Sequence, residues 1–331
     1  MTSGGELASN GARRILIAAN PISGARPSSG TIERLQSLLI DAGYNVVILR
    51  ERDGLAEAAE RSLHDGELRA VVAAGGDGTV GRVVNQTPPG VPLAVLPMGT
   101  ENLVARYLGQ QRGADAVFQT LHRGHLIRMD AGSANGRLFV LMCSAGLDAE
   151  VVHRLHIARR GHITRLSYAK PLLQTIRSYG YPELTLSVQC TDGESAQQPQ
   201  PVSARWVVVV NVPLYGLGLN FAPQADPADG QLDVCTLSRG STWSGMWFLW
   251  RVRRGLHIGR ADCTLRQCAA LRIESAGDVA YQVDGDPGGR LPIDIEAVPG
   301  RLKFVVPPEA AAKWGDSAVL FAAWPGVEGR P

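Results

Sequence analysis

A glycine-rich turn near residue 75 carries the side chains with the clearest chemical potential. Residues 71–74 form an apolar run typical of a buried strand, and apolar residues resume at helical spacing from Val80. Between them the chain reads GGDGT. At such a junction backbone N–H groups face an anion, and glycines let a phosphate approach. A carboxylate there makes sense mainly with a metal ion, so Asp77 indicates a magnesium-bound nucleotide. The residues expected at the phosphates are Gly75, Gly76, Gly78 and Thr79; the alternative is a plain turn capped by Thr79.

Two further turns repeat this pattern. Residues 20–24 read NPISG after a first strand-like run, and residues 97–102 read PMGTEN after another. Asn, Ser, Thr and Gly offer amide, hydroxyl and open backbone donors, although NPISG alone is also ordinary turn chemistry. Because parallel strands end at one edge of a sheet, we expect the three turns to share one cleft. The residues expected to contact the nucleotide here are Asn20, Ser23, Gly24, Gly99, Thr100 and Asn102.

The elements that must position these turns predict two domains. Over residues 13–125, strand-like runs at 15–19, 46–49, 68–74 and 91–96 alternate with helix-like segments, so we expect a doubly wound parallel α/β sheet. Over residues 126–306, short strands separated by turns predict an antiparallel β domain, with helical inserts near 163–179 and 242–254. These strands are expected at 139–143, 184–188, 206–211, 232–237, 265–273, 279–283, 291–295 and 302–306. Residues 1–12 are expected to be a disordered start and residues 307–331 a C-terminal tail.

Composition limits the function classes. A length of 331 residues suits two domains, and a formal net charge of +2 gives no case for nucleic acid. Five scattered cysteines with no C-x-x-C pair indicate neither a disulfide framework nor a zinc site. The start lacks a signal-peptide pattern, and no apolar stretch approaches the ~20 residues of a membrane span. We therefore expect a cytoplasmic protein that meets any lipid from the water side. A homodimer is compatible with the sequence, which carries no signal for oligomeric state.

The motifs N-P-x-S-G, G-G-D-G-T and P-x-G-T-x-N, in this order and spacing, resemble the diacylglycerol kinase catalytic-domain family. That family includes bacterial lipid kinases and is related to the sphingosine and ceramide kinases; G-G-D-G-T is more distantly similar to NAD kinase. Segments 146–149 (GLDA), 226–233 (DPADGQLD) and 284–286 (DGD) are similar too, so the resemblance spans residues 13–306. It implies a nucleotide in a cleft between an α/β domain and a β-sandwich domain.

The resemblance also implies catalytic roles, with ATP and Mg²⁺ as cofactors. Asp77 would help hold the magnesium-bound ATP, Asp130 matches a family aspartate in the magnesium network, and Asp284 would lie near the nucleotide. Asp286 replaces the last residue of the family's D-G-E, the general base that takes the proton of the lipid hydroxyl. It is one methylene shorter, and the alternative is a simple hairpin turn. A second departure is Leu103, where many members have Asp.

A second metal site is implied in the loop at 226–231. Asp226, Asp229 and the Gln231 carbonyl resemble a structural magnesium site of the family. Two carboxylates three residues apart and a carbonyl suit a hard ion. Without the resemblance, these residues would be interpreted as a solvated turn.

Two segments could meet a bilayer. Residues 153–170 are rich in Arg and His with interleaved apolar residues, so a solvated basic face and a membrane contact both stay open. Trp243, Trp247 and Trp250 lie at i, i+4 and i+7 and are followed by arginines. An aromatic stripe at this spacing is usually part of a core, so burial is the expectation for these tryptophans. Membrane contact is the alternative.

Together these patterns predict an ATP-dependent lipid kinase. It would transfer the γ-phosphate to a hydroxyl of diacylglycerol, a sphingoid base or a related lipid, and associate peripherally with the inner membrane face. NAD kinase is one alternative, although the NPISG segment and the late DGD turn stand against it. A catalytically inactive nucleotide- or lipid-binding protein is another, kept open by Asp286 and Leu103.

Overall fold

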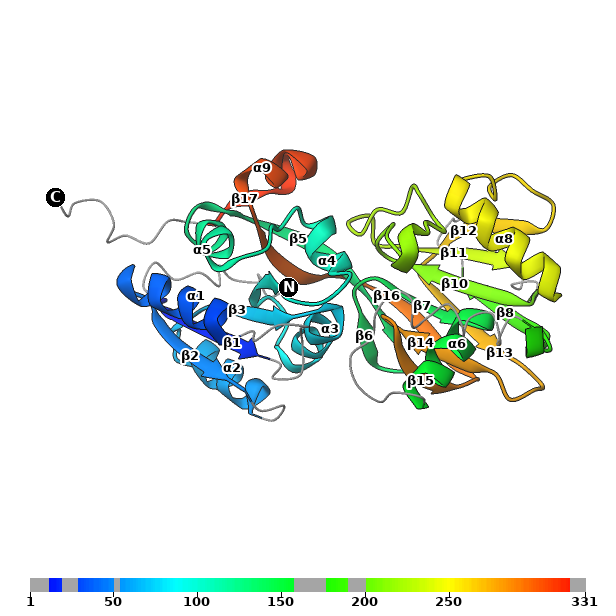
Figure 1. The fold of residues 1–331 in the computed structure, drawn as a ribbon, viewed down its shortest axis with the longest axis horizontal. Coiled ribbons are helices and arrows are strands. Elements are labelled where there is room, and N and C mark those ends of the chain that lie inside the picture. The colour runs from blue at the N-terminus through cyan, green and yellow to red at the C-terminus, as the bar shows by residue number, and fades with distance from the viewer. Residues whose placement is uncertain (1–11, 20–28, 51–53, 158–176, 190–200, 322–331) are drawn as a thin grey trace. The chain divides into compact units, whose positions relative to one another are not determined.

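The computed structural model describes residues 12–19, 29–50, 54–157, 177–189 and 201–321 (Figure 1). The chain forms two compact units, one of residues 1–129 and 300–331 and one of residues 130–299. Several predictions lie wholly or mostly outside the described residues: the disordered start, the NPISG turn with Asn20, Ser23 and Gly24, the helical insert at 163–179, and most of the basic segment 153–170.

The first unit contains a parallel sheet with strand order β2-β1-β3-β4. Its strands are β1 (Arg14–Ala19), β2 (Asn45–Leu49), β3 (Leu68–Gly75) and β4 (Pro92–Pro97). Helices α1 (Ser29–Asp41), α2 (Leu55–His64), α3 (Asp77–Gln86), α4 (Leu103–Tyr107) and α5 (Ala114–Arg123) alternate with or follow these strands.

Helices cover both faces of this sheet. In β3, Val72 and Ala74 join a core with the apolar sides of α1 and α5. Val71 and Ala73 are also buried and point to the opposite face, since side chains alternate along a strand; α2 and α3 pack there. Burial on both faces explains why β3 is continuously apolar. The predicted doubly wound α/β fold is confirmed.

The C-terminal residues complete the first unit. The end of β16 (Ile293–Val306) pairs in parallel with β4, placing Lys303 opposite Pro92. After it come α9 (Pro308–Ala311), the 3₁₀ helix η3 (Ala312–Ser317) and β17 (Val319–Leu320), which pairs with β5 (His125–Ala134). The compact units therefore divide at 129/130 and 299/300, whereas the sequence analysis set boundaries near 125 and 306.

The second unit is a β-sandwich. One antiparallel sheet has the order β12-β11-β10-β7-β14-β15, and β13, β8 and β9 extend from β16 in the other. Side chains of both sheets, such as Val207, Leu271 and Ile295, share one core. The bounds are β7 (Met142–Ala145), β8 (Leu184–Gln189), β9 (Val202–Ala204), β10 (Trp206–Val210), β11 (Leu232–Leu237), β12 (Cys263–Cys268), β13 (Ala270–Glu274), β14 (Ala280–Val283) and β15 (Asp286–Arg290).

Some strand predictions need correction. The predicted strand 265–273 is two strands in different sheets, β12 and β13, which separate at Ala269. The runs 291–295 and 302–306 belong to one strand, because the Pro299–Gly300 pair is accommodated inside β16 with Gly300 at a φ of 60°.

The remaining elements are short or surround the sandwich. They are β6 (Arg137–Phe139), α6 (Leu147–Ile157), the 3₁₀ helix η2 (Gly216–Gly218) and α8 (Thr242–Arg254), of which α8 was predicted at the same residues. Within the described part of the chain, no helix is both long and apolar enough to cross a membrane.

Candidate functional site

The turn after β3 leads directly into α3. β3 ends at Gly75, α3 begins at Asp77, and the N–H of Thr79 donates to the carbonyl of Gly76 at 2.9 Å. The Thr79 side chain is buried over Gly75, where an added Cβ would overlap it. Glycine is therefore required at position 75 so that Thr79 can close the turn.

The turn after β4 is closed by Asn102. This residue has a φ of 48°, accepts from the Gly99 N–H at 2.7 Å and donates to the Gly99 carbonyl at 2.7 Å. Arg112 donates to the same carbonyl at 2.8 Å. The buried Asn102 amide thus shapes the loop, while Thr100 is exposed to solvent.

These two predicted turns lie against each other. A Cβ built on Gly99 would be 2.6 Å from the Cα of Gly76, so no side chain fits at position 99. The structure therefore brings together the residues predicted after β3 and after β4 in one backbone cradle. The third predicted turn lies outside the described residues.

Asp77 combines burial with a structural hydrogen bond. Its Oδ1 accepts from the Val104 N–H at 3.0 Å, at the start of α4. Burial raises the pKa of this carboxyl, the N–H groups of Val104 and Leu103 oppose the rise, and the Glu101 charge adds to it. Leu103, where the family has Asp, is buried and supplies no second carboxylate.

The donor set around Asp77 fits a magnesium ion that arrives with a nucleotide. Among the described residues there is no group of three or more His, Cys, Asp or Glu arranged to hold a metal. Mg²⁺ with a nucleotide uses only one or two carboxylates, and phosphates and water supply the other ligands. A cation beside Asp77 would also favour the ionised carboxylate that burial disfavours.

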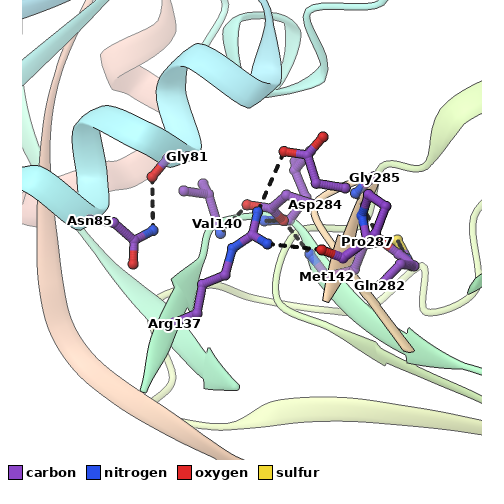
Figure 2. Close-up of polar contacts among 11 residues, drawn as sticks. Gly81, Asn85, Arg137, Val140, Met142, Gln282, Asp284, Gly285 and Pro287 are labelled. Carbon is purple, nitrogen blue, oxygen red and sulfur yellow. Dashed lines mark hydrogen bonds and ion pairs between the residues drawn. The ribbon is translucent and has the colours of Figure 1, made fainter. Parts of the chain in front are cut away.

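In the second unit, the turn at 284–286 is held by its own side chains (Figure 2). Asp284 has a φ of 51°, and its carboxylate accepts from the N–H groups of Val140 and Leu141, both at 2.8 Å, and of Met142 at 3.0 Å. The Gly285 N–H donates to the Gln282 Oε1 at 2.7 Å. These bonds make Asp284 a clamp on residues 140–142; its contact with a nucleotide stays a prediction.

Asp286, the candidate base, lies at the start of β15 with its side chain 40% exposed. Arg137 approaches its Oδ2 at 3.4 Å and donates to the Pro287 carbonyl at 3.3 Å, as Figure 2 shows for Pro287. The sequence analysis missed Arg137, because nothing in its neighbourhood distinguishes it from the many other arginines of the chain.

A buried polar network supports this turn. The Gln282 Nε2 donates to the Ser144 Oγ at 2.8 Å, and Ser144 donates to Asp148. Asp148 also accepts from the Trp206 Nε1 at 2.6 Å and the Tyr215 hydroxyl at 3.1 Å. Burial raises the pKa of Asp148 against the effect of these bonds. Gln282 connects this network to Gly285, next to the candidate base.

The loop of the predicted second metal site lies beside Asp130, which was predicted in the magnesium network of the nucleotide. Asp130, in β5, accepts from the Gly230 N–H at 2.7 Å, while Asp226 and Asp229 accept from N–H groups of their own loop. Nearby Asp233 has a buried Oδ1 without a hydrogen-bond partner among the described residues. Burial, and then the charges of Asp229 and Asp226, raise its pKa to about 6. Among the described residues these carboxylates do not form a group arranged to hold a metal, and metal binding here stays a prediction.

Comparisons with known proteins agree with this architecture. Residues 14–134 match the family model described as the diacylglycerol kinase catalytic domain, and residues 141–306 match the one described as the YegS C-terminal NAD kinase beta sandwich-like domain. The chain belongs to the diacylglycerol kinase family. Membership of this family identifies the protein as a lipid kinase.

Individual relatives cover most of the chain. Diacylglycerol kinases of Staphylococcus aureus strains bovine RF122 / ET3-1 and MRSA252 are 27% identical over 303 residues, which is 86% of this chain and 89% of each relative. The crystal structure of a putative diacylglycerol kinase from Bacillus anthracis str. Sterne has a TM-score of 0.68 at 20% identity, covering 90% of this chain and 98% of that one. An NAD kinase from Archaeoglobus fulgidus in complex with ATP has a TM-score of 0.52 at 10% identity, covering 92% and 98%. Both structures show the shared fold.

Proposed function

We propose that this lipid kinase transfers the γ-phosphate of ATP to a hydroxyl of diacylglycerol or a related lipid alcohol such as a sphingoid base, with Mg²⁺ as cofactor. The observation that carries the proposal is the backbone cradle of Gly76 and Gly99 beside the half-buried Asp77, in a chain of this family. Such a cradle suits phosphates, which need close backbone approach and N–H donors.

In the first unit the residues bind and orient the nucleotide. The N–H groups of the GGDGT turn would hold its phosphates, and Asp77 would hold the magnesium ion. Bound magnesium neutralises the charge of the phosphates in phosphoryl transfer. The hydrogen bond from Val104 fixes the Asp77 carboxylate, so no side-chain freedom is lost when the nucleotide binds.

In the second unit Asp286 would act as the general base. The proton of the lipid hydroxyl would pass to an Asp286 carboxylate oxygen as the hydroxyl oxygen forms a bond to the γ-phosphorus. The bond from that phosphorus to the β–γ bridging oxygen would break, and ADP would leave. Its partial exposure makes the carboxylate reachable, while the Asp284 clamp and Arg137 orient it. The loop with Asp226, Asp229 and the Gln231 carbonyl would hold a separate structural magnesium ion. Asp130, which accepts from the Gly230 N–H beside this loop, would belong to the magnesium network of the nucleotide.

The proposal extends to where the protein acts. Long-chain lipid alcohols reside in bilayers, so turnover requires at least transient contact with a membrane. We therefore propose peripheral association with the inner face of the cytoplasmic membrane.

The test is incubation with labelled ATP and three acceptors, namely diacylglycerol and sphingosine in detergent micelles and NAD in solution. We expect labelled phospholipid from the wild type, and a fall in kcat of about 10²- to 10⁴-fold in Asp286→Asn, the range of general-base catalysis. Asp286→Glu, which restores the family's residue, serves as the matched variant and should retain activity. Labelled NAD without labelled lipid would indicate an NAD kinase. Binding of ATP without transfer to any acceptor would indicate an inactive binding protein.

A further inference from the structure

Helix α8 exposes the tryptophans that the sequence analysis expected in a core. Trp243, Trp247 and Trp250 are 79%, 51% and 42% exposed, so that expectation is wrong. The helix instead buries Phe248 and Val252, and Phe248 packs edge-on against Trp206 with ring centroids 5.5 Å apart. One face of α8 therefore already meets the sandwich, and the tryptophan face meets solvent.

The exposed apolar residues are concentrated around this helix. Of the twelve large apolar side chains exposed among the described residues, seven form what we name the α8 surface. They are Leu217, Trp243, Met246, Trp247, Trp250, Leu256 and Ile258. Arg253 donates to the Leu217 carbonyl, which connects Leu217 to the helix. A patch of this composition on a soluble unit marks an interaction surface.

Positive charges predominate around the α8 surface. Residues 234–261 contain no Asp or Glu but five arginines, three of them in the last turn of the helix. Arg251 lies over the Trp247 ring at 5.1 Å, and Arg254 lies over the Trp250 ring at 5.6 Å. Asp262 faces Arg251 at 3.7 Å and also pairs with Arg260, so it offsets only part of this positive charge.

We propose that the α8 surface docks the protein on an anionic phospholipid bilayer. Tryptophan rings with guanidinium groups at their edges suit the headgroup region, where rings meet acyl chains and cations meet phosphates. A second copy is a poorer occupant, because a two-fold dimer would bring the same arginine-rich patch against itself. This inference rests on the proposed function, since a lipid kinase must meet its substrate in a membrane.

The test is sedimentation of the full chain with vesicles of phosphatidylcholine and phosphatidylglycerol, beside vesicles of phosphatidylcholine alone. The wild type should bind the anionic vesicles, more weakly at high salt, with its tryptophan emission shifted to shorter wavelength. The variant Trp243→Gln/Trp247→Gln/Trp250→Gln should bind at least about a hundredfold more weakly, since burial of each aromatic ring contributes roughly tenfold. These side chains are exposed, so the variant is expected to fold.

The matched control is Ile40→Gln/Val319→Gln/Leu320→Gln, which removes three exposed apolar side chains of the first unit and should bind like the wild type. Equal binding by the wild type and the tryptophan variant would overturn the proposal. So would a wild-type dimer that the tryptophan variant converts to a monomer, because the face would then belong to a second copy.

A kinase assay on short-chain diacylglycerol in detergent micelles separates the two proposals. The tryptophan variant should keep its rate in micelles and lose it on vesicles. Vesicle binding without any kinase activity would contradict the proposed function and support the docking surface. Kinase activity without vesicle binding would support the proposed function and contradict the docking surface.

Discussion

The two regions predicted to carry the catalytic residues are built in opposite ways. The cradle after β3 and β4 is made by backbone, because only glycines allow positions 76 and 99 to approach. The turn at 284–286 is made by side chains, with Asp284 holding three N–H groups and Gln282 holding Gly285. A region that binds phosphates through the backbone must exclude side chains, whereas a region that aims one carboxylate needs others to hold its turn.

The largest expected effect comes from a substitution that disrupts the backbone-built region. In Gly99→Ala the new Cβ would lie 2.6 Å from the Gly76 Cα, so the two turns must separate. We expect a loss of unfolding free energy of about 1–3 kcal/mol and a roughly 100-fold fall in kinase rate, because misplacing bound phosphates is costly. Chemical denaturation and the micelle assay measure these two quantities.

Gly30→Ala is the matched control, since a Cβ there meets nothing within 4 Å in α1. It should be neutral or stabilising by up to about 1 kcal/mol. Wild-type activity in Gly99→Ala would show that the close approach of the two turns is unimportant.

The next largest effect is expected from a substitution that disrupts the side-chain-built region. Asn tolerates the positive φ of Asp284, so Asp284→Asn keeps the backbone but turns an amide N–H toward the N–H groups of residues 140–142. We expect a loss of about 1–3 kcal/mol in unfolding free energy and a fall in kcat with little change in the KM for ATP.

The exposed residue Asp278 provides the comparison, and Asp278→Asn should stay within about 0.5 kcal/mol of the wild type. If Asp284→Asn raised the KM for ATP and left stability unchanged, Asp284 would be a nucleotide contact rather than a clamp.

A third prediction concerns pH and the half-buried Asp77 carboxylate of the backbone-built region. Burial raises the pKa of Asp77 above 3.8, so its proton is retained to higher pH than in the unfolded chain. Affinity for magnesium-bound ATP should therefore fall as pH decreases through this raised pKa, by up to about tenfold per pH unit below it. Titration of ATP affinity against pH checks this.

The raised pKa of Asp77 also makes the unfolding free energy depend on pH. The stability associated with protonated Asp77 is present at low pH and is lost as pH rises from 3.8 through the raised pKa. Asp77→Asn should consequently match or exceed the wild type in unfolding free energy at pH 7 while losing ATP affinity. A variant that is both less stable at pH 7 and unchanged in ATP affinity would make Asp77 purely structural.

The smallest expected effect concerns Arg137, which lies beside the turn at 284–286. Arg137→Gln removes the half-exposed ion pair with Asp286, which lies at 3.4 Å. Such pairs contribute little, so we expect about 0.5 kcal/mol or less in unfolding free energy and a modest fall in kcat. A loss as large as that of Asp284→Asn would mean that Arg137, rather than the clamp, holds the turn.

The contrast explains what the sequence could predict. The GGDGT and GTEN turns were predictable, because glycine at a strand end is itself the structural requirement, and the alternation of strands and helices fixed the α/β fold. The support of Asp286 was not, because it comes from residues far from it along the chain. Arg137 belongs to a strand of the other sheet, and Ser144 and Asp148 connect to the turn only through Gln282.

The prediction that the α8 tryptophans are buried was wrong for a related reason. Helical spacing identifies which residues share a face but not whether that face packs inward. Phe248 and Val252 lie on another face of the same helix and are buried, with Phe248 packed against Trp206 of the sandwich. The charge pattern was the better signal, since a segment with five arginines and no acidic residue is more often exposed than part of a core.

Strand β16 has a consequence for biosynthesis. It places Phe304 and Val305, buried near the end of the chain, in the unit that residues 14–19 begin. A nascent chain emerging from the ribosome therefore carries β4 as an open edge until some two hundred further residues have been translated. The β-sandwich can close in the meantime only up to residue 299, and the sheet of the first unit is completed only when the end of β16 pairs with β4.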